Sequence, residues 1–141
     1  MAVAPRFIAD KSAVARLPQA AVNAVLAPLI LAGEVATCSV IELEVLYSAR
    51  SYEDFVSTRS DRGRAFPRVP ILQADFDRAA HVMELLAKSG RHRAVGLPDL
   101  VIAAVAERAG LVVLHYDGDY DFVAEVTGQQ MQWVVPRGSV P

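Results

Sequence analysis

Four acidic side chains of this chain lie at the ends of apolar segments or between apolar residues. They are Asp10, Glu44, Asp99 and Asp117. If the fold brings them together, two carboxylates ~4 Å apart in an effective dielectric of ~20 repel each other by roughly 4 kcal/mol. Such a cluster therefore needs bound protons or a cation. Because hard divalent ions prefer oxygen ligands, the pattern predicts a metal site and the chemistry that such an ion supports.

The size and composition of the chain favour one globular unit. Its 141 residues can bury a substantial core, 53% of them are hydrophobic, and the formal net charge is -2. We therefore expect a single domain over residues 1–141. The same composition excludes a disordered tail and a globally basic coat for nucleic acid.

The cysteine count and the apolar stretches indicate where the protein acts. Cys38 is the only cysteine, which excludes an intrachain disulfide and fits a reducing compartment. The longest apolar stretch, residues 20–32, is interrupted by Asn23 and Pro28 and is too short to span a bilayer. Residues 1–10 lack the long apolar region of a secretory signal. We expect a cytoplasmic protein that does not enter a membrane.

Short apolar strands alternate with helices along the chain. Strands are expected at residues 7–9, 35–37, 111–114 and 132–135, and helices at residues 18–33, 39–50, 52–64, 76–90, 98–110 and 120–126. This alternation predicts an α/β fold, a three-layer α/β/α sandwich around a mainly parallel sheet. Ligands of such sheets bind beyond the carboxyl ends of the strands, where Asp10 and Asp117 stand.

The aspartates also have a purely structural interpretation. Asp10 and Asp99 stand at helix starts, where an Asp commonly accepts hydrogen bonds from backbone N–H groups. Asp119 is expected to cap or begin the helix that follows Asp117, and an outer place around the metal is its alternative role. Taken one at a time, these residues do not separate a cap from a ligand.

Glu44 has a different alternative, a solvated position on an amphipathic helix. Leu43 and Val45 beside it leave little polar face there. Glu42, one register away, is the better candidate for exposure. We therefore expect Glu44 to point inward and Glu42 outward.

The motifs around the acids occur in an order that resembles one nuclease family. They are Asp10 with Ser12 after an apolar strand, Glu44-Val45-Leu46-Tyr47, Pro98-Asp99-Leu100-Val101-Ile102-Ala103-Ala104, and Leu114-His115-Tyr116-Asp117-Gly118-Asp119-Tyr120. Together they are similar to the PIN-domain nucleases, and among these to the VapC-type ribonuclease toxins of bacterial toxin-antitoxin pairs. The chain departs from that pattern at Lys11, Ser48 and His115, and none of these departures removes a carboxylate.

The resemblance implies a PIN-like fold and a Mg2+-dependent or Mn2+-dependent endoribonuclease, the toxin of a type II toxin-antitoxin pair. Asp10, Asp99 and Asp117 are then expected to hold the ion, directly or through waters. Glu44 is expected to orient or deprotonate the attacking water, and Ser12 to bond a phosphate oxygen or a ligand water. The expected products carry a 5′-phosphate and a 3′-hydroxyl.

RNA is the first expected partner, and basic side chains of residues 50–93 are the candidates to hold it. They are Arg59, Arg62, Arg64, Arg91 and Arg93. Phosphate contacts of this kind supply most sequence-independent affinity. The alternative is a solvated surface on which the arginines offset Glu53, Asp54 and Asp61.

The resemblance adds a cognate antitoxin, whose C-terminal segment lies across the toxin and masks the acidic site. The helices at 18–33 and 39–50, with parts of the helix at 52–64, could form the receiving groove. Its candidate apolar residues are Val22, Leu26, Leu29 and Ile30. An ordinary place in the core is the alternative for these residues. A homodimer is also expected from the family.

Two other functions compete with the nuclease. A catalytically silent PIN-like interaction module would keep the acids only to hold structure or a partner. An Asp-based phosphotransfer domain also places an Asp after a parallel strand. A receiver-type site needs a lysine after a late strand, however, and the only lysines are Lys11 and Lys88.

Overall fold

Parallel strands form the centre of the fold. The computed structural model describes residues 4–141 and contains a sheet in the order β2-β1-β3-β4. The strands are β1 (Phe7–Ala9), β2 (Val35–Ala36), β3 (Val112–His115) and β4 (Met131–Trp133), and each neighbouring pair is parallel. All lie where the apolar runs predict strands, with small shifts at their ends.

Helices fill the segments between the strands. They are α1 (Lys11–Val14), α2 (Ala20–Leu31), α3 (Ser39–Tyr47), α4 (Tyr52–Ala65), α5 (Gln73–Ala87), α6 (Leu97–Ala109) and α7 (Asp119–Thr127). The sequence pattern predicts all of these except α1, which is too short to show an apolar period. α2 begins at Ala20 rather than at Pro18, and Pro28 lies inside it.

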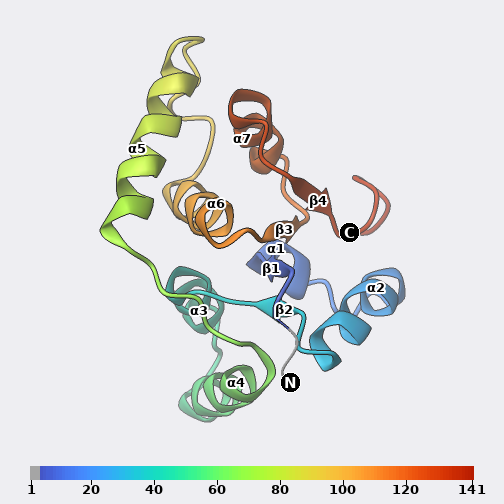
Figure 1. Ribbon diagram of the computed structural model, residues 1–141. Coiled ribbons are helices and arrows are strands. Elements are labelled where there is room, and N and C mark those ends of the chain that lie inside the picture. Colours follow the sequence, from blue (N-terminus) through green and yellow to red (C-terminus); the bar gives the residue numbers. More distant parts are fainter. Residues whose placement is uncertain (1–3) are drawn as a thin grey trace.

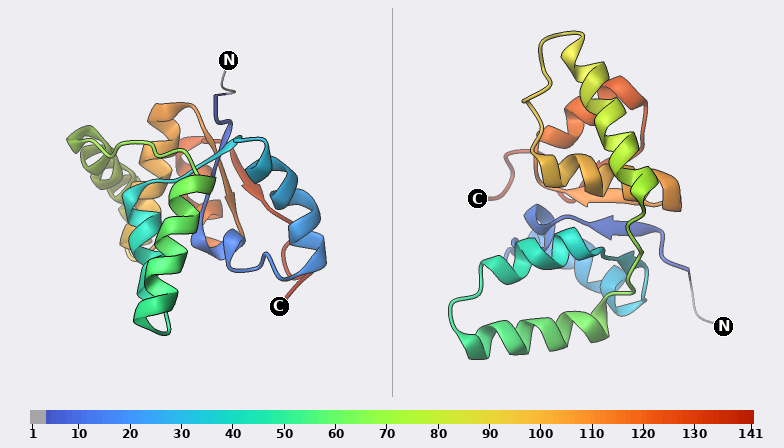
Figure 2. Two further views of the ribbon diagram at one scale, coloured as in Figure 1. Left: turned by 90° about the horizontal axis from the view of Figure 1, so that it is seen from below. Right: turned by 90° about the vertical axis from the view of Figure 1, so that its left-hand side faces the viewer.

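The two faces of the sheet carry separate parts of the core. Ile8 and Val113 point to one face, where they pack with buried residues of α3, α5, α6 and α7. Ala9 and Leu114 point to the other face, against α1 and α2. In Figure 1, α3, α5 and α6 lie on one side of the strands and α2 on the other, and Figure 2 shows the strands between the helices. The predicted three-layer sandwich is confirmed.

The topology places two of the acidic residues together. β1 pairs with both β2 and β3, so the chain order along the sheet reverses between β1 and β3. Asp10 directly follows β1, and Asp117 comes two residues after β3. This reversal is the point at which α/β sheets form a ligand crevice beyond their strand ends.

α6 is the central helix and carries Asp99 in its first turn. Gly96 is its N-cap residue, Pro98 lies at its start, and Gly110 ends it in the left-handed conformation with φ 71°. Its middle, residues 100–106, is buried throughout. Because α6 is held on all sides by the core, Asp99 at its N-terminus has a fixed position.

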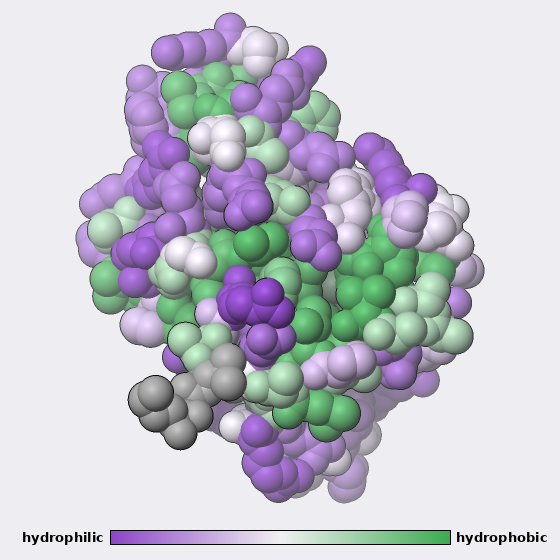
Figure 3. Space-filling model, turned by 45° about the vertical axis from the view of Figure 1, so that its right-hand side comes forward, coloured by the Kyte–Doolittle hydropathy of each residue, from purple (hydrophilic) through white to green (hydrophobic). Residues whose placement is uncertain are grey.

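α2 is apolar around its whole circumference, with Asn23 as its polar residue. Val22 and Leu26 are fully buried, whereas Leu31 is 88% exposed. The core interpretation of Val22 and Leu26 is therefore correct, and their predicted place in a receiving groove is wrong. The side of the molecule with α2 comes forward in Figure 3, where hydrophobic surface is broken by hydrophilic side chains.

Within residues 4–141, no helix is long and apolar enough to cross a membrane.

Candidate active site

The acidic side chains converge on one pocket, as the sequence pattern predicts. Asp10, Glu44, Asp99 and Asp117 line a cavity of about 300 Å³ together with Lys11, Ser12, Ala15, Gly96 and Pro98. Oxygen atoms of Asp10, Glu44 and Asp99 lie within 4.8 Å of one another, as do those of Asp99, Asp117 and Asp119. Asp99 belongs to both groups and is therefore the centre of the cluster.

Asp10 is both a helix cap and a member of the cluster. It is the N-cap residue of α1, and its Oδ2 accepts hydrogen bonds from the Ser12 backbone N–H (3.0 Å) and the Ser12 hydroxyl (2.6 Å). Its Oδ1 accepts a third hydrogen bond from the Tyr120 hydroxyl at 2.8 Å. Capping α1 therefore fixes the orientation of the Asp10 carboxylate, which is also a carboxylate of the pocket.

Ser12 lines the pocket and is hydrogen-bonded to Asp10. Its hydroxyl donates to Asp10 and accepts a hydrogen bond from the Tyr116 backbone N–H at 2.9 Å. The hydroxyl hydrogen is therefore directed at Asp10, so Ser12 orients that carboxylate. Its expected bond to a phosphate oxygen or a ligand water stays a prediction.

Asp99 is a ligand candidate and not a cap. Gly96 occupies the N-cap position of α6, and Asp99 lies three residues later with 9% of its surface exposed. Burial raises the pKa of Asp99 from its ordinary value of 3.8 to about 8, and the carboxylates around it add to the shift. Without a cation, the pocket therefore keeps a proton at neutral pH.

Glu44 has a carboxylate oxygen that accepts no hydrogen bond from the described residues. Its Oε1 is buried and has no hydrogen-bond partner among the described residues. Burial raises the pKa of Glu44, repulsion from Asp10 and Asp117 adds to this, and attraction to Lys11 reduces it. An unpaired buried carboxylate oxygen is costly. Oxygen donors on three or more side chains, with one acceptor left unpaired, fit a hard divalent ion.

Glu42 is the residue for which the predicted exposure is wrong. It is 6% exposed, and its carboxylate accepts hydrogen bonds from the Arg62 guanidinium at 2.8, 2.9 and 3.1 Å. Thr37 donates a further hydrogen bond at 2.6 Å. Burial opposes ionisation of Glu42, but the hydrogen bonds from Arg62 and Thr37 outweigh it and lower its pKa. Glu42 therefore fastens α3 to α4 and to the end of β2.

Asp117 and Asp119 form the second part of the cluster. Asp117 Oδ1 accepts a hydrogen bond from the Asp119 backbone N–H at 2.9 Å. Asp119 begins α7, and its Oδ2 accepts a hydrogen bond from the Gly96 backbone N–H at 3.3 Å. Asp119 therefore begins a helix, as expected, and also offers a ligand oxygen beside Asp117. It ties α7 to the residue that caps α6.

The arginine candidates for RNA binding fall into different groups. Arg62 is 8% exposed and paired with Glu42, so the structure corrects its expected role from an RNA contact to a buried ion pair. Arg64 pairs with Asp61 at 2.6 Å and Arg91 with Glu125 at 3.5 Å on the surface. Arg59, Arg64, Arg91 and Arg93 are exposed, and their contact with RNA stays a prediction.

Two buried polar side chains beside the pocket are not evident from the sequence pattern. Tyr120 is fully buried, and its hydroxyl reaches Asp10 and, at 3.3 Å, Asp99. His115 is fully buried between the rings of Tyr120 and Trp133, with centroid distances of 4.8 and 5.0 Å. The signal for Tyr120 is its place among the apolar residues of α7, because a buried tyrosine hydroxyl needs a partner.

The raised pKa of Asp99 predicts a pH-dependent stability. Between pH ~4 and about 8, the unfolded chain has lost the proton that the folded pocket still holds, so rising pH favours unfolding. In EDTA, the free energy of unfolding should fall by at most about 1.4 kcal/mol per pH unit from this group. Asp99→Asn should flatten that fall in urea titrations at pH 5 and pH 8. Equal pH dependence in both proteins would contradict the assignment of the buried proton.

The sequence of this chain is similar to those of known proteins over most of its length. The family model of the PIN domain matches residues 9–126. Ribonuclease VapC21 of Mycobacterium tuberculosis is 41% identical over 134 residues, which cover 95% of this chain and 97% of that protein. Ribonuclease VapC51 of the same organism is 41% identical over 139 residues, covering 98% and 99%.

A solved structure gives an independent view of the fold. The DNA-bound VapBC from Salmonella typhimurium matches with a TM-score of 0.74 and 16% sequence identity, covering 93% of this chain and 99% of that chain. At this identity the match supports the fold alone, and the family rests on the sequence matches. The chain belongs to the PIN-domain family and, within it, to the group of the VapC proteins.

Proposed function

We propose that the chain is a single PIN domain that acts as a metal-dependent endoribonuclease, the toxin of a type II toxin-antitoxin pair. The observation that carries the proposal is the convergence of Asp10, Glu44, Asp99 and Asp117 on one pocket, with a buried Glu44 oxygen left without a partner. The relatives named ribonucleases at 41% identity support RNA as the substrate. A ribonuclease toxin has to reach cellular RNA, so we expect the protein to act in the cytoplasm.

The donor set suits Mg2+ or Mn2+, because the pocket offers carboxylate oxygens and room for waters. Asp10, Asp99 and Asp117 would hold the ion, and Asp119 offers a further oxygen on the Asp117 side. When bound, such an ion lowers the pKa of a water molecule and offsets the charge that grows on the phosphoryl oxygens.

The chain itself supplies the proton acceptor and the alignment. Glu44 Oε1 is free to accept the proton of the attacking water, and its raised pKa makes it a stronger base than an exposed glutamate. Ser12, which also lines the pocket, holds Asp10 in place through the hydrogen bond to its Oδ2. The products would carry a 5′-phosphate and a 3′-hydroxyl. Arg59, Arg64, Arg91 and Arg93 are exposed candidates to hold the RNA backbone.

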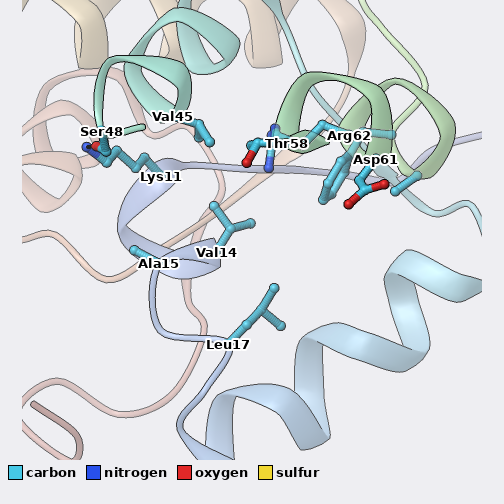
Figure 4. Close-up of a pocket in the computed structure, with 11 residues that line it drawn as sticks. Lys11, Val14, Ala15, Leu17, Val45, Ser48, Thr58, Asp61 and Arg62 are labelled. Carbon is cyan, nitrogen blue, oxygen red and sulfur yellow. Dashed lines mark hydrogen bonds between the residues drawn. The ribbon is translucent and has the colours of Figure 1, made fainter. Parts of the chain in front are cut away.

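An antitoxin is the proposed protein partner, and an apolar groove beside the pocket is its proposed contact. Val14, Leu17 and Val45 line this groove, with α4 on its far side (Figure 4). Lys11 and Ala15 line both the groove and the acidic pocket, so the two are continuous. An antitoxin segment with apolar side chains followed by an arginine would fit both, with the apolar side chains in the groove and the arginine in the acidic pocket. α3 and α4 border the groove, as the sequence suggests, whereas α2 does not.

The test is cleavage of RNA by the purified protein with and without divalent metal. Mg2+ or Mn2+ should allow cleavage, EDTA should stop it, and sequencing of RNA 5′ ends should locate the cut sites. Glu44→Gln, purified in the same way, controls for contaminating nuclease and should lose at least ~100-fold in rate. A homodimer stays a prediction of the family resemblance.

The alternative function predicts the opposite result. A silent interaction module would bind its partner but leave RNA intact at every metal concentration. The unpaired buried oxygen of Glu44 speaks against it, because a purely structural acid would be hydrogen-bonded, as Glu42 is. Equal RNA cleavage by the wild type and Glu44→Gln would remove the support for the nuclease.

A further inference from the structure

Tyr120 lies between two carboxylates of the candidate metal site. It is the second residue of α7, none of its surface is exposed, and its ring packs against His115. Its hydroxyl oxygen is 2.8 Å from Asp10 Oδ1 and 3.3 Å from Asp99 Oδ1. Among residues 4–141, no other side chain is hydrogen-bonded to both of these aspartates.

We propose that Tyr120 is a positioning residue, whose hydroxyl sets the direction and separation of the Asp10 and Asp99 carboxylates so that they can share one divalent ion. The inference rests on the proposed function, since the ion belongs to that proposal. It concerns a residue that makes no contact with substrate and that the proposed reaction does not otherwise use.

The hydrogen bonds that the Asp10 carboxylate accepts leave one of its lone pairs free to bind a metal ion. A carboxylate offers about four lone-pair sites. The Ser12 backbone N–H, the Ser12 hydroxyl and the Tyr120 hydroxyl occupy three of them. The fourth belongs to the oxygen that Tyr120 orients, Oδ1. Together with the two bonds from Ser12, the hydroxyl of Tyr120 therefore sets where the free lone pair of Asp10 points.

Asp99 depends on Tyr120 in a different way. The hydrogen bond from Tyr120 reaches its Oδ1, and its carboxylate is surrounded by the acidic groups of Asp10, Asp117 and Glu44. When Asp99 is ionised, as a metal ligand must be, repulsion would turn it away from Asp10 if nothing lay between them. A shared hydroxyl hydrogen between the two carboxylates opposes that rotation and keeps both oxygens on one side of the pocket.

The ring and the hydroxyl of Tyr120 have separable roles. The ring fills a place in the core with Val123 and Ile102, which a phenylalanine would fill equally well. The hydroxyl serves the carboxylates alone. Partners of this kind, which hold metal ligands in orientation, commonly change metal affinity or activity 10–100-fold when they are removed.

The experiment compares Tyr120→Phe with Tyr116→Phe. The Tyr116 hydroxyl donates to the Val140 carbonyl at 2.8 Å and accepts from the Val140 backbone N–H at 3.2 Å, both outside the acidic cluster, so this control also removes a hydrogen-bonded tyrosine hydroxyl. Isothermal titration of each metal-free protein with Mn2+ alone gives the Kd. We expect Tyr120→Phe to raise the Kd about 10–100-fold and Tyr116→Phe to leave it within about 3-fold of the wild type.

A second measurement separates positioning from damage to the fold. If Tyr120 only orients ligands, the Mn2+ concentration for half-maximal RNA cleavage should rise about 10–100-fold in Tyr120→Phe, and cleavage should recover at saturating Mn2+. A damaged fold would lower the rate at every Mn2+ concentration without moving the midpoint, and this result would overturn the inference. Thermal melts in EDTA identify a variant that does not fold.

The outcomes also separate this inference from the proposed function. Wild-type protein that binds Mn2+ but cleaves no RNA would end the nuclease proposal, while the Kd of Tyr120→Phe would still decide the role of Tyr120. A Kd of Tyr120→Phe equal to that of the wild type would overturn the positioning role and leave the nuclease intact. Wild-type protein that binds no Mn2+ would overturn the inference.

Discussion

Asp99→Asn is expected to abolish metal-dependent RNA cleavage while leaving the fold intact. Asp99 is the one residue that belongs to both groups of converging oxygens, and it stands in the first turn of the buried helix α6. Asparagine has the same shape but neither the charge nor the second carboxylate oxygen. If the ion contributes several kcal/mol to the transition state, its loss should lower the rate by roughly 1,000-fold or more.

The measurement is the initial rate of cleavage of a labelled RNA at saturating Mg2+. Asp77→Asn is the matched control, because Asp77 is exposed on α5 and bonds only with Gln73 among the described residues. The control should cleave at the wild-type rate. Cleavage at that rate by Asp99→Asn, in a preparation free of other nucleases, would refute the assignment of the site.

The same substitution should have the opposite effect on stability. Asp99 is surrounded by other acids, and its raised pKa means that ionisation of this group destabilises the folded state as pH rises toward 8. Asp99→Asn in EDTA at pH 8 should therefore unfold at a higher urea concentration than the wild type. A loss of activity together with a gain in stability is typical of a site that function requires and the fold does not.

The elements and the convergence of the acids were predictable because they follow from local patterns and one topological rule. Apolar runs of three or four residues mark the strands around Ile8 and Val113, and Gly110 ends α6 at the position that the sequence indicates. Parallel strands then bring the residues that follow them to one edge. Asp10 and Asp117 could be placed together for this reason without any knowledge of side-chain contacts.

The orientations of Glu42 and Glu44 were predictable only in part. Both lie on α3 among apolar residues, so the local pattern could favour an inward Glu44 but had no information about a partner for Glu42. That partner, Arg62, is 20 residues later and on another helix. A glutamate that is buried by a distant arginine has no local signal, since its burial depends on how α3 and α4 pack.

Tyr120 was missed for a related reason. A tyrosine at the start of an apolar helix face fits a core position, and its ring does lie in the core. The functional group is its hydroxyl, which is hydrogen-bonded to Asp10, 110 positions earlier in the chain, and to Asp99, 21 positions earlier. Such contacts appear only once the strands and helices are assembled.

Arg62→Met is expected to destabilise the protein by about 3–5 kcal/mol, the usual effect of leaving one charge of a buried pair without its partner. Arg62 and Glu42 have side chains that are 9% and 8% exposed, and their contact at 2.8 Å is accompanied by the Thr37 hydrogen bond. Arg62 also lies over the Phe66 ring at 4.4 Å. Replacing Arg62 by Met therefore leaves the buried charge of Glu42 without its cationic partner. It also removes the contact between the guanidinium and the Phe66 ring at the end of α4.

Urea unfolding of four proteins distinguishes this role from an RNA contact. Arg59→Met, on the exposed side of the same helix, should change the free energy of unfolding by no more than about 0.5 kcal/mol. The double variant Glu42→Leu with Arg62→Met should recover much of the lost stability, because apolar residues that replace both partners leave no unpaired charge. If Arg62→Met unfolds at the wild-type urea concentration and only weakens RNA binding, the arginine serves the substrate and the buried pair contributes nothing measurable.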